Sequence, residues 1–340
     1  MGEVNSLEEI RAVADAAIKP IVAECDSVAL VGFPDHSNVG DSAIWLGELS
    51  YLKGQSVSVA YSCSSDSYRK ENLASHTDSD APILIHGGGH FGDVWPTGLD
   101  FMLRVVTDFP ERSIVVMPQT VHFESRAQLD RARRVINGHG SMTLCVRDDR
   151  SASLAKGYFD HPVVLTPDSA VFLDLDVATR GTGILYLARE DREAPAESPF
   201  THRSGITKTD WVNLPVPRMP ARAFPAVLHR TKARLQAHVR DSDSVAWQEG
   251  IVSSSRNALA KYRLRRGVLL LASAEVIVTD RLHAHILSVL LGLPHVLLDN
   301  SYGKVRTYYE TWSQNLPLVH WASNPEEAFT MAETLRDRVR

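Results

Sequence analysis

The sequence predicts an α/β fold in which two doubly wound domains follow one another and enclose a central cleft. Short apolar runs alternate with segments of helical periodicity over residues 27–173, which is typical of a parallel sheet covered by helices. A second alternating series follows a charged, proline-rich stretch over 189–220. The length of 340 residues is also large for a single hydrophobic core. We therefore expect domains over 1–175 and 176–323, followed by a terminal helix over 324–340.

The first half is expected to alternate strictly between helices and strands. Ser6–Glu9 fits a capping box, and the apolar stripe that begins at Leu7 predicts the first helix. Asp41 or Ser42 can cap the second helix, and 62–81 is interpreted as a polar connection. The expected strands are 27–33, 56–61, 82–86, 113–117, 142–146 and 163–165, and the further helices are 43–52, 99–109, 126–136 and 152–156. Parallel strands end at one edge of a sheet, so the polar loops between these elements should meet there.

The second half shows the same pattern after an irregular segment. Residues 189–220 are interpreted as a domain junction with a long active-site loop. The expected strands are 182–188, 275–279 and 295–298, and the expected helices are 222–239, 250–274, one from Leu282 onward and 325–338.

Composition excludes several classes of protein. A net charge of −5 argues against general binding to nucleic acid. The three cysteines form no CxxC pair, and neither a secretory signal nor a run of 18 apolar residues is visible, so a reducing cytoplasmic setting is expected. The basic runs 222–240 and 262–266 are ordinary solvated faces on the simplest interpretation. They could also dock an anionic lipid-linked precursor at the inner face of a membrane.

Two polar residues stand where a buried strand is expected to become a helix. Arg281 and His283 follow the apolar run 276–278, and the backbone N–H groups that open such a helix favour an anion. A purely structural interpretation, in which Asp280 caps the helix and the other side chains are paired in the core, competes with a site. His285 faces away from His283 and is interpreted as structural.

Three successive glycines follow the third expected strand. Gly87, Gly88 and Gly89 allow close backbone approach and unusual dihedral angles, so we expect a ligand or a crossing chain beside them. A dinucleotide fingerprint would instead follow the first strand, and that interpretation is therefore weak.

Seven motifs in order resemble the polysaccharide pyruvyltransferase family over about Val31 to Trp312. They are NVGD at Asn38–Asp41, HGGGHFGD at His86–Asp93, MPQT at Met117–Thr120, VRDDRS at Val146–Ser151, TPDSA at Thr166–Ala170, TDRLHA at Thr279–Ala284 and DNSYGK at Asp299–Lys304. The resemblance implies two Rossmann-like domains arranged as in GT-B glycosyltransferases, with the acceptor on the N-terminal and the donor on the C-terminal side. It implies phosphoenolpyruvate as donor, and as acceptor a sugar of a lipid-linked or polymeric glycan. The product that it implies is a pyruvate ketal in an exopolysaccharide or other cell-envelope glycan. His90 departs from the pattern, since many relatives carry Asn there.

This chemistry assigns roles to particular residues. The donor carries a carboxylate and a phosphate, which cations and oriented N–H groups can hold, so Arg147 and Arg281 are expected to be catalytic with His283 as general acid. Expected substrate-binding residues are Asn38, Asp41, Gly87, Gly88, Gly89, His90, Asp93, Gln119, Ser301 and Lys304. For Asn38, Asp41, Asp93 and Gln119, helix capping or loop closure is an equally serious role. No metal or cofactor is required. A nucleotide-sugar glycosyltransferase and a non-catalytic glycan-binding protein remain the alternatives.

Overall fold

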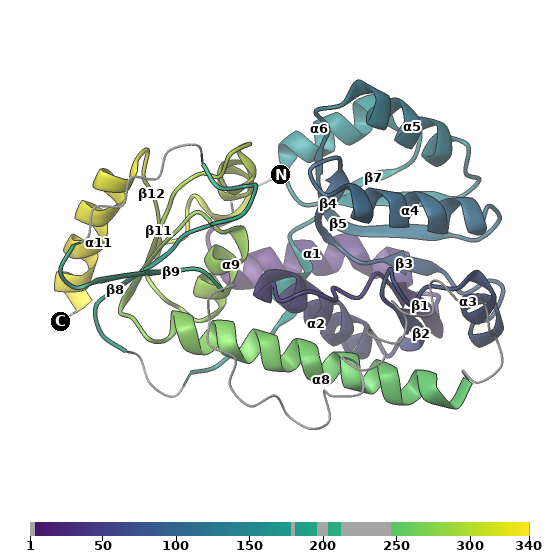
Figure 1. Cartoon of the computed structure of the whole chain (residues 1–340), viewed down its shortest axis with the longest axis horizontal. Coiled ribbons are helices and arrows are strands. Elements are labelled where there is room, and N and C mark those ends of the chain that lie inside the picture. The colour runs from purple at the N-terminus through teal and green to yellow at the C-terminus, as the bar shows by residue number, and fades with distance from the viewer. Residues whose placement is uncertain (1–3, 178–180, 196–202, 212–245, 340) are drawn as a thin grey trace.

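The computed structural model shows two parallel β-sheets set side by side, each flanked by helices (Figure 1). It describes residues 4–177, 181–195, 203–211 and 246–339. This arrangement confirms the predicted α/β class and is consistent with a Rossmann-like fold.

The first sheet has the strand order β2-β1-β3-β5-β6-β7, and β4 pairs with β5 beyond this path. Its strands are β1 Ser27–Val31, β2 Ser58–Cys63, β3 Ile83–Ile85, β4 Gly88–Gly92, β5 Ile114–His122, β6 Met142–Val146 and β7 Val163–Leu165. Its helices are α1 Leu7–Val22, α2 Val39–Gly54, α3 Lys70–His76, α4 Pro96–Asp108, α5 Arg126–Asn137 and α6 Asp149–Tyr158, with a 3₁₀ turn over Ser169–Phe172. All recorded pairings in this sheet are parallel, so the strands end at one common edge.

Alternating side chains bury both faces of this sheet. In β1, Val28 and Leu30 join the core that contains α1 and α2. Ala29 and Val31 point to the other face, where α4 and α5 cover the sheet. Such burial on both faces explains why the strands are continuously apolar.

The second sheet has the order β12-β11-β10-β8-β9. Its strands are β8 Ile184–Leu187, β9 Ile206–Thr209, β10 Val276–Thr279, β11 His295–Leu297 and β12 Val319–Trp321. The helices in this half are α8 Ala246–Leu271, α9 Leu282–Leu290, α10 Lys304–Tyr308 and α11 Pro325–Val339, with a π-helical turn over Tyr309–Ser313. Phe329 of α11 packs against Tyr186 of β8, with ring centroids 5.3 Å apart. This helix therefore covers the outer face of the sheet.

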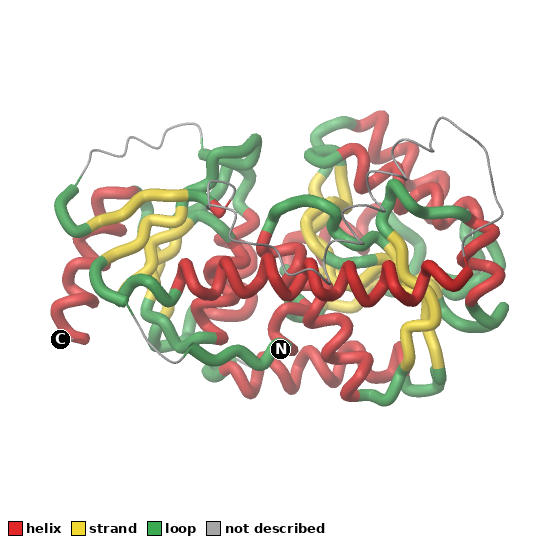
Figure 2. The backbone as a smooth tube through the Cα atoms, turned by 60° about the horizontal axis from the view of Figure 1, so that its bottom comes forward, coloured by secondary structure: helices red, strands yellow, loops and turns green. Residues whose placement is uncertain are grey.

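Helix α8 passes along both sheets (Figure 2). Its Asn257 accepts a hydrogen bond from Trp45 of α2 at 2.9 Å, and Arg256 donates to the Ser62 carbonyl oxygen of β2 at 2.8 Å. One hydrophobic cluster also joins Leu30 of the first sheet to Ile277 of the second. In the part of the chain that the structure describes, the two halves therefore share one core and are not separated by a visible break in packing. The expected domain boundaries at 175 and 323 and the expected central cleft stay predictions.

Several local expectations were wrong. Helix α2 begins at Val39, and its cap is Asn38, whose Oδ1 accepts from the Gly40 N–H at 3.0 Å, not Asp41 or Ser42. The residues that follow β3, which were expected to form a loop, contain β4. Strand β5 was expected to end at 117 but continues as far as His122. Pairing between β4 and β5 satisfies their backbone groups, and this outweighs the poor strand propensity of glycine and proline.

Other elements were not anticipated. The polar connection 62–81 contains α3. Strands β9 and β12 were missed because they lie at the two edges of the second sheet and are only partly buried, so neither forms a continuous apolar run. The expected helix 222–239 lies outside the described residues. Within the basic run 262–266, Arg263 is buried and donates to the Pro34 carbonyl oxygen at 2.8 Å, so this side chain does not belong to a solvated face.

Candidate active site

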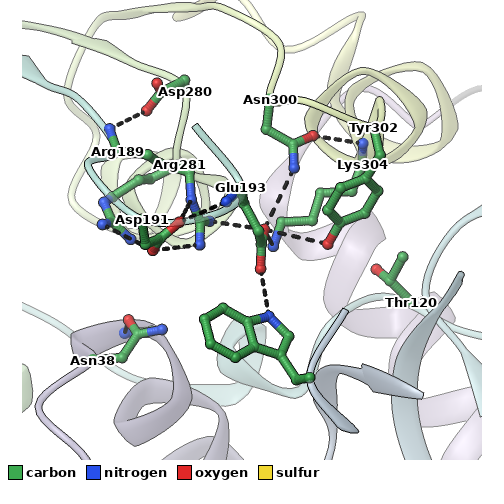
Figure 3. A network of polar contacts seen from close by, with 12 residues as sticks. Asn38, Thr120, Arg189, Asp191, Glu193, Asp280, Arg281, Asn300, Tyr302 and Lys304 are labelled. Carbon is green, nitrogen blue, oxygen red and sulfur yellow. Dashed lines mark hydrogen bonds and ion pairs between the residues drawn. The ribbon is translucent and has the colours of Figure 1, made fainter. Parts of the chain in front are cut away.

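Charged and polar side chains from both sheets meet at the carboxyl ends of their strands. Arg147 follows β6, Asp168 follows β7, and Gln119 lies near the end of β5. From the second sheet, Arg281 follows β10 and Lys304 follows β11. Figure 3 shows part of this site, with Asn38 and Thr120 opposite the charged groups of the second sheet. The strand-edge rule therefore correctly predicts that these side chains lie together at one edge.

A buried carboxylate holds two of the predicted catalytic residues. Oδ2 of Asp168 accepts from Nη1 of Arg147 at 2.6 Å and lies 3.3 Å from Nε2 of His283. Burial raises the pKa of Asp168, but the nearby charges of His283 and Arg147 outweigh it and hold this pKa below its usual range. Asp168 is therefore ionised and links the two halves. The Arg147 carbonyl oxygen also accepts from Nε1 of Trp312 at 2.8 Å, which fixes the backbone of Arg147.

Gly40 allows the His283 ring to lie against the first turn of α2. A Cβ atom on Gly40 would lie only 2.2 Å from Nδ1 of His283 and 2.5 Å from its Cγ. No side chain larger than that of glycine fits this contact. Nε2 of His283 is therefore directed to Asp168, while Nδ1 is packed against the helix.

The three glycines have different structural roles. Gly87 approaches β5 so closely that a Cβ would lie 2.8 Å from the Pro118 carbonyl oxygen, and Gly88 has a φ of +133°. Gly89 instead faces two cations: a Cβ there would lie 3.4 Å from Nη2 of Arg147 and 3.7 Å from Nζ of Lys304. The absent side chain leaves space beside both cationic groups.

Glu193 joins Lys304 to the first sheet (Figure 3). Its carboxylate pairs with Nζ of Lys304 and accepts from Nε1 of Trp95 at 2.8 Å. Burial raises the pKa of Glu193, but Lys304 and Arg189 lower it to about 2. The ring of Tyr302 stacks on that of His122 with centroids 4.6 Å apart, which brings the 299–304 loop against β5.

Arg281 is bound within a neighbouring group of carboxylates. Its guanidinium pairs with Asp210, at the end of β9, and lies 3.5 Å from Oδ2 of Asp191. Arg189 also pairs with Asp191, with 2.9 Å between Nη2 and Oδ2, and its Nη1 lies 3.1 Å from Oε2 of Glu193. Nε of Arg281 is buried and has no hydrogen-bond partner among the residues that the structure describes. Ion pairs thus connect Arg281 to Lys304.

The NVGD and HGGGHFGD motifs adjoin His283 on the first-sheet side. Asn38 Nδ2 donates to Asp41 at 2.9 Å. Burial raises the pKa of Asp41, but His36 and His283 lower it below the usual value. Nε2 of His90 lies 2.9 Å from Nε2 of Gln119, and the His90 backbone N–H donates to the same amide at 3.2 Å. These four predicted residues therefore lie together.

Two predicted residues hold loops. Asp93 accepts from the backbone N–H of Glu124 at 3.0 Å and also from that of Ser125, and this contact closes the turn before α5. Ser301 is exposed, and its backbone N–H donates to the Glu193 carbonyl oxygen at 3.2 Å. Their predicted contacts with substrate remain predictions.

Sequence reasoning missed several functional candidates. Glu193, Arg189 and Asp191 lie in the segment interpreted as an active-site loop, but none of them was predicted as a site residue, although they follow strand β8 and the strand-end rule applied to them too. Asp168 was quoted within a motif but given no role. His285 is buried, with its ring nitrogens 2.7 Å from His295 and 2.8 Å from Ser313, which supports a structural role.

Two further features concern membranes and metals. Within the described ranges, no helix combines the length and apolar character that spanning a membrane requires. The same residues contain no group of three or more His, Cys, Asp or Glu side chains arranged to hold a metal ion.

The fold and the site together define the class of protein. It is a Rossmann-like α/β protein with a charged site at the ends of its parallel strands. Residues 38–302 match the model of the polysaccharide pyruvyl transferase family, and the chain belongs to that family. It is therefore an enzyme that transfers pyruvyl groups to polysaccharide.

Relatives support this assignment. The chain is 33% identical to Pyruvyl transferase 1 of Schizosaccharomyces pombe over 86% of this chain and 71% of that protein. It is 26% identical to EpsO of Bacillus subtilis, provisionally named a pyruvyl transferase, over 90% and 92% of the two chains. A solved structure of an uncharacterized Klebsiella pneumoniae protein superposes with a TM-score of 0.56 over 92% of this chain and 98% of that one. At 16% identity, this likeness supports the fold alone.

Proposed function

We propose that the enzyme takes pyruvate from phosphoenolpyruvate and attaches it to two hydroxyls of one sugar as a ketal. The observation that carries the proposal is that Nη2 of Arg147 and Nζ of Lys304 both approach Gly89, at 3.4 Å and 3.7 Å from the position of a Cβ there. Two cations beside one glycine suit a small donor with both a carboxylate and a phosphate. His283 adjoins the same site through Asp168.

The reaction begins with a proton transferred to the methylene carbon of the donor. His283 supplies it from Nε2, since Nδ1 is packed against Gly40, and this step requires the Nε2 proton to turn from Asp168, 3.3 Å away, to the donor. Protonation creates an oxocarbenium-like centre at C2. A sugar hydroxyl attacks that carbon and loses its proton. The C–O bond to phosphate then breaks, with the electron pair leaving on phosphate.

A second hydroxyl of the same sugar closes the ketal on C2 and releases another proton. One of the two hydroxyl protons restores His283, and the other leaves with phosphate, so atoms and charges balance. In this proposal Arg147 and Lys304 stabilise the departing phosphate, whereas Asn38 and Asp41 hold sugar hydroxyls. The acceptor is a sugar of a surface glycan or its lipid-linked precursor, which a peripheral contact at the inner membrane face would present.

The test is a donor and acceptor screen with the purified chain. Phosphoenolpyruvate is incubated with aryl glycosides and lipid-linked oligosaccharides, and products are read by mass gain for one pyruvate ketal together with released phosphate. UDP- and GDP-sugars are the competing donors. Transfer from those sugars alone would indicate a glycosyltransferase, and glycan binding without phosphate release would indicate a non-catalytic protein.

A further inference from the structure

We propose that Glu193 is a positioning residue for this reaction, which holds the Lys304 ammonium group beside Gly89. The inference rests on the proposed function, because it treats Lys304 as a donor-binding group. Nζ of Lys304 lies 3.7 Å from the position of a Cβ on Gly89, and it pairs with Oε2 of Glu193. An ammonium group has three N–H donors, so others remain for an anion once Glu193 has taken one.

The Glu193 carboxylate is fixed independently of Lys304. Besides the Trp95 contact at 2.8 Å, Tyr302 donates to it at 3.2 Å and Asn300 at 3.4 Å, and Arg189 lies 3.1 Å away. These donors come from both halves of the molecule, and Figure 3 shows them converging on one carboxylate. The Glu193 side chain is also only 3% exposed. Glu193 is therefore held in place before Lys304 or a donor binds.

Lys304 needs a fixed counter-charge because its surroundings oppose its own charge. The charged and titratable groups that face it are Glu193, Arg189, Arg147 and Tyr302. Burial and the two arginines lower the pKa of Lys304 and Glu193 raises it, and together they hold this pKa at about 8. Without Glu193, the amine would lose its proton at a lower pH and would no longer attract an anion.

A different role for Glu193 would be that of an internal anion which the donor displaces. Displacement would require the contacts with Trp95, Asn300, Tyr302 and Arg189 to break together, which leaves several buried donors unpaired. The contacts therefore favour a permanent support over a competitor.

The test compares the full-length parent with Glu193→Gln, Glu193→Asp and a control, Glu190→Gln. Glu190 is exposed in the same segment, so its substitution removes the same charge outside the site. The first readout is the pKa of Lys304, from competitive labelling of lysines with acetic anhydride and mass spectrometry. The second is the pH profile of kcat/KM with phosphoenolpyruvate as donor.

Glu193→Gln should lower the pKa of Lys304 by about one unit or more and move the alkaline limb of kcat/KM by a similar amount. At pH 8, about half of Lys304 would be protonated in the parent and about a tenth in Glu193→Gln, so KM for phosphoenolpyruvate should rise about fivefold, with a smaller change in kcat. Glu193→Asp should restore most of the shift, and Glu190→Gln should match the parent.

Two results would overturn the inference: an equal loss of activity at every pH with an unchanged pKa of Lys304, or tighter donor binding by Glu193→Gln. If the parent transfers nothing from phosphoenolpyruvate, the proposed function fails. Even then, the labelling experiment decides whether Glu193 raises the pKa of Lys304.

Discussion

The contact between Gly40 and His283 allows a sharp test with one methyl group. In Gly40→Ala, the new Cβ would lie 2.2 Å from Nδ1 of His283. Non-bonded heavy atoms rest at about 3.5 Å, so the ring must move by about 1 Å. A displacement of that size in a catalytic group costs about 100-fold in rate. We also expect a loss of about 1–3 kcal/mol in the free energy of unfolding, because the site becomes overpacked.

Gly54→Ala is the matched control, since Gly54 lies on the same helix and a Cβ there meets nothing within 4 Å. Alanine is the better helix former, so this variant should be at least as stable as the parent. The assay is phosphate release with phosphoenolpyruvate and a working acceptor, alongside urea unfolding.

A double-mutant cycle shows whether the effect passes through the histidine. In a His283→Ala background, Gly40→Ala should cost little further activity, because the ring that it displaces is absent. A folded Gly40→Ala enzyme with the parental kcat would refute the reasoning.

Three further predictions concern acid–base chemistry and buried charge. His283→Ala should lower kcat by about 10²–10⁴-fold with little change in unfolding free energy, and turnover at the parental rate would remove His283 from the mechanism. Glu48→Ala should cost about 3–5 kcal/mol in urea unfolding, because it leaves His86, now 2.8 Å from Glu48, buried without its counter-ion. A loss below about 1 kcal/mol would contradict this ion pair. Glu193 has a folded pKa of about 2 against an ordinary 4.5, so its stabilisation is complete above pH 4.5 and is lost as pH falls toward 2. Over that range the unfolding free energy of the parent should fall by on the order of 3 kcal/mol more than that of Glu193→Gln. An identical pH dependence in the two proteins would contradict the lowered pKa of Glu193.

The sequence by itself determined the fold class and the edge of the sheets where the site lies. Apolar alternation and helical spacing are local properties, so they predicted β6, α5 and β10 within a few residues. Parallel strands share a direction, so residues that follow them, such as Arg147 and Lys304, could be placed at one edge before any coordinates. Local pattern failed at β4 and at the end of β5, because pairing between distant segments decided those strands.

Only the tertiary structure decided which charges are partners. Asp168 meets His283 across 115 residues of sequence, and Glu193 meets Trp95 across 98. No periodicity encodes such contacts, since they depend on how α2, α8 and α9 pack the two halves around one core. The same packing brings Gly40 against His283 and places Gly89 beside two cations. The types of residue at the site are therefore readable from the chain, whereas their pairing arises from long-range packing.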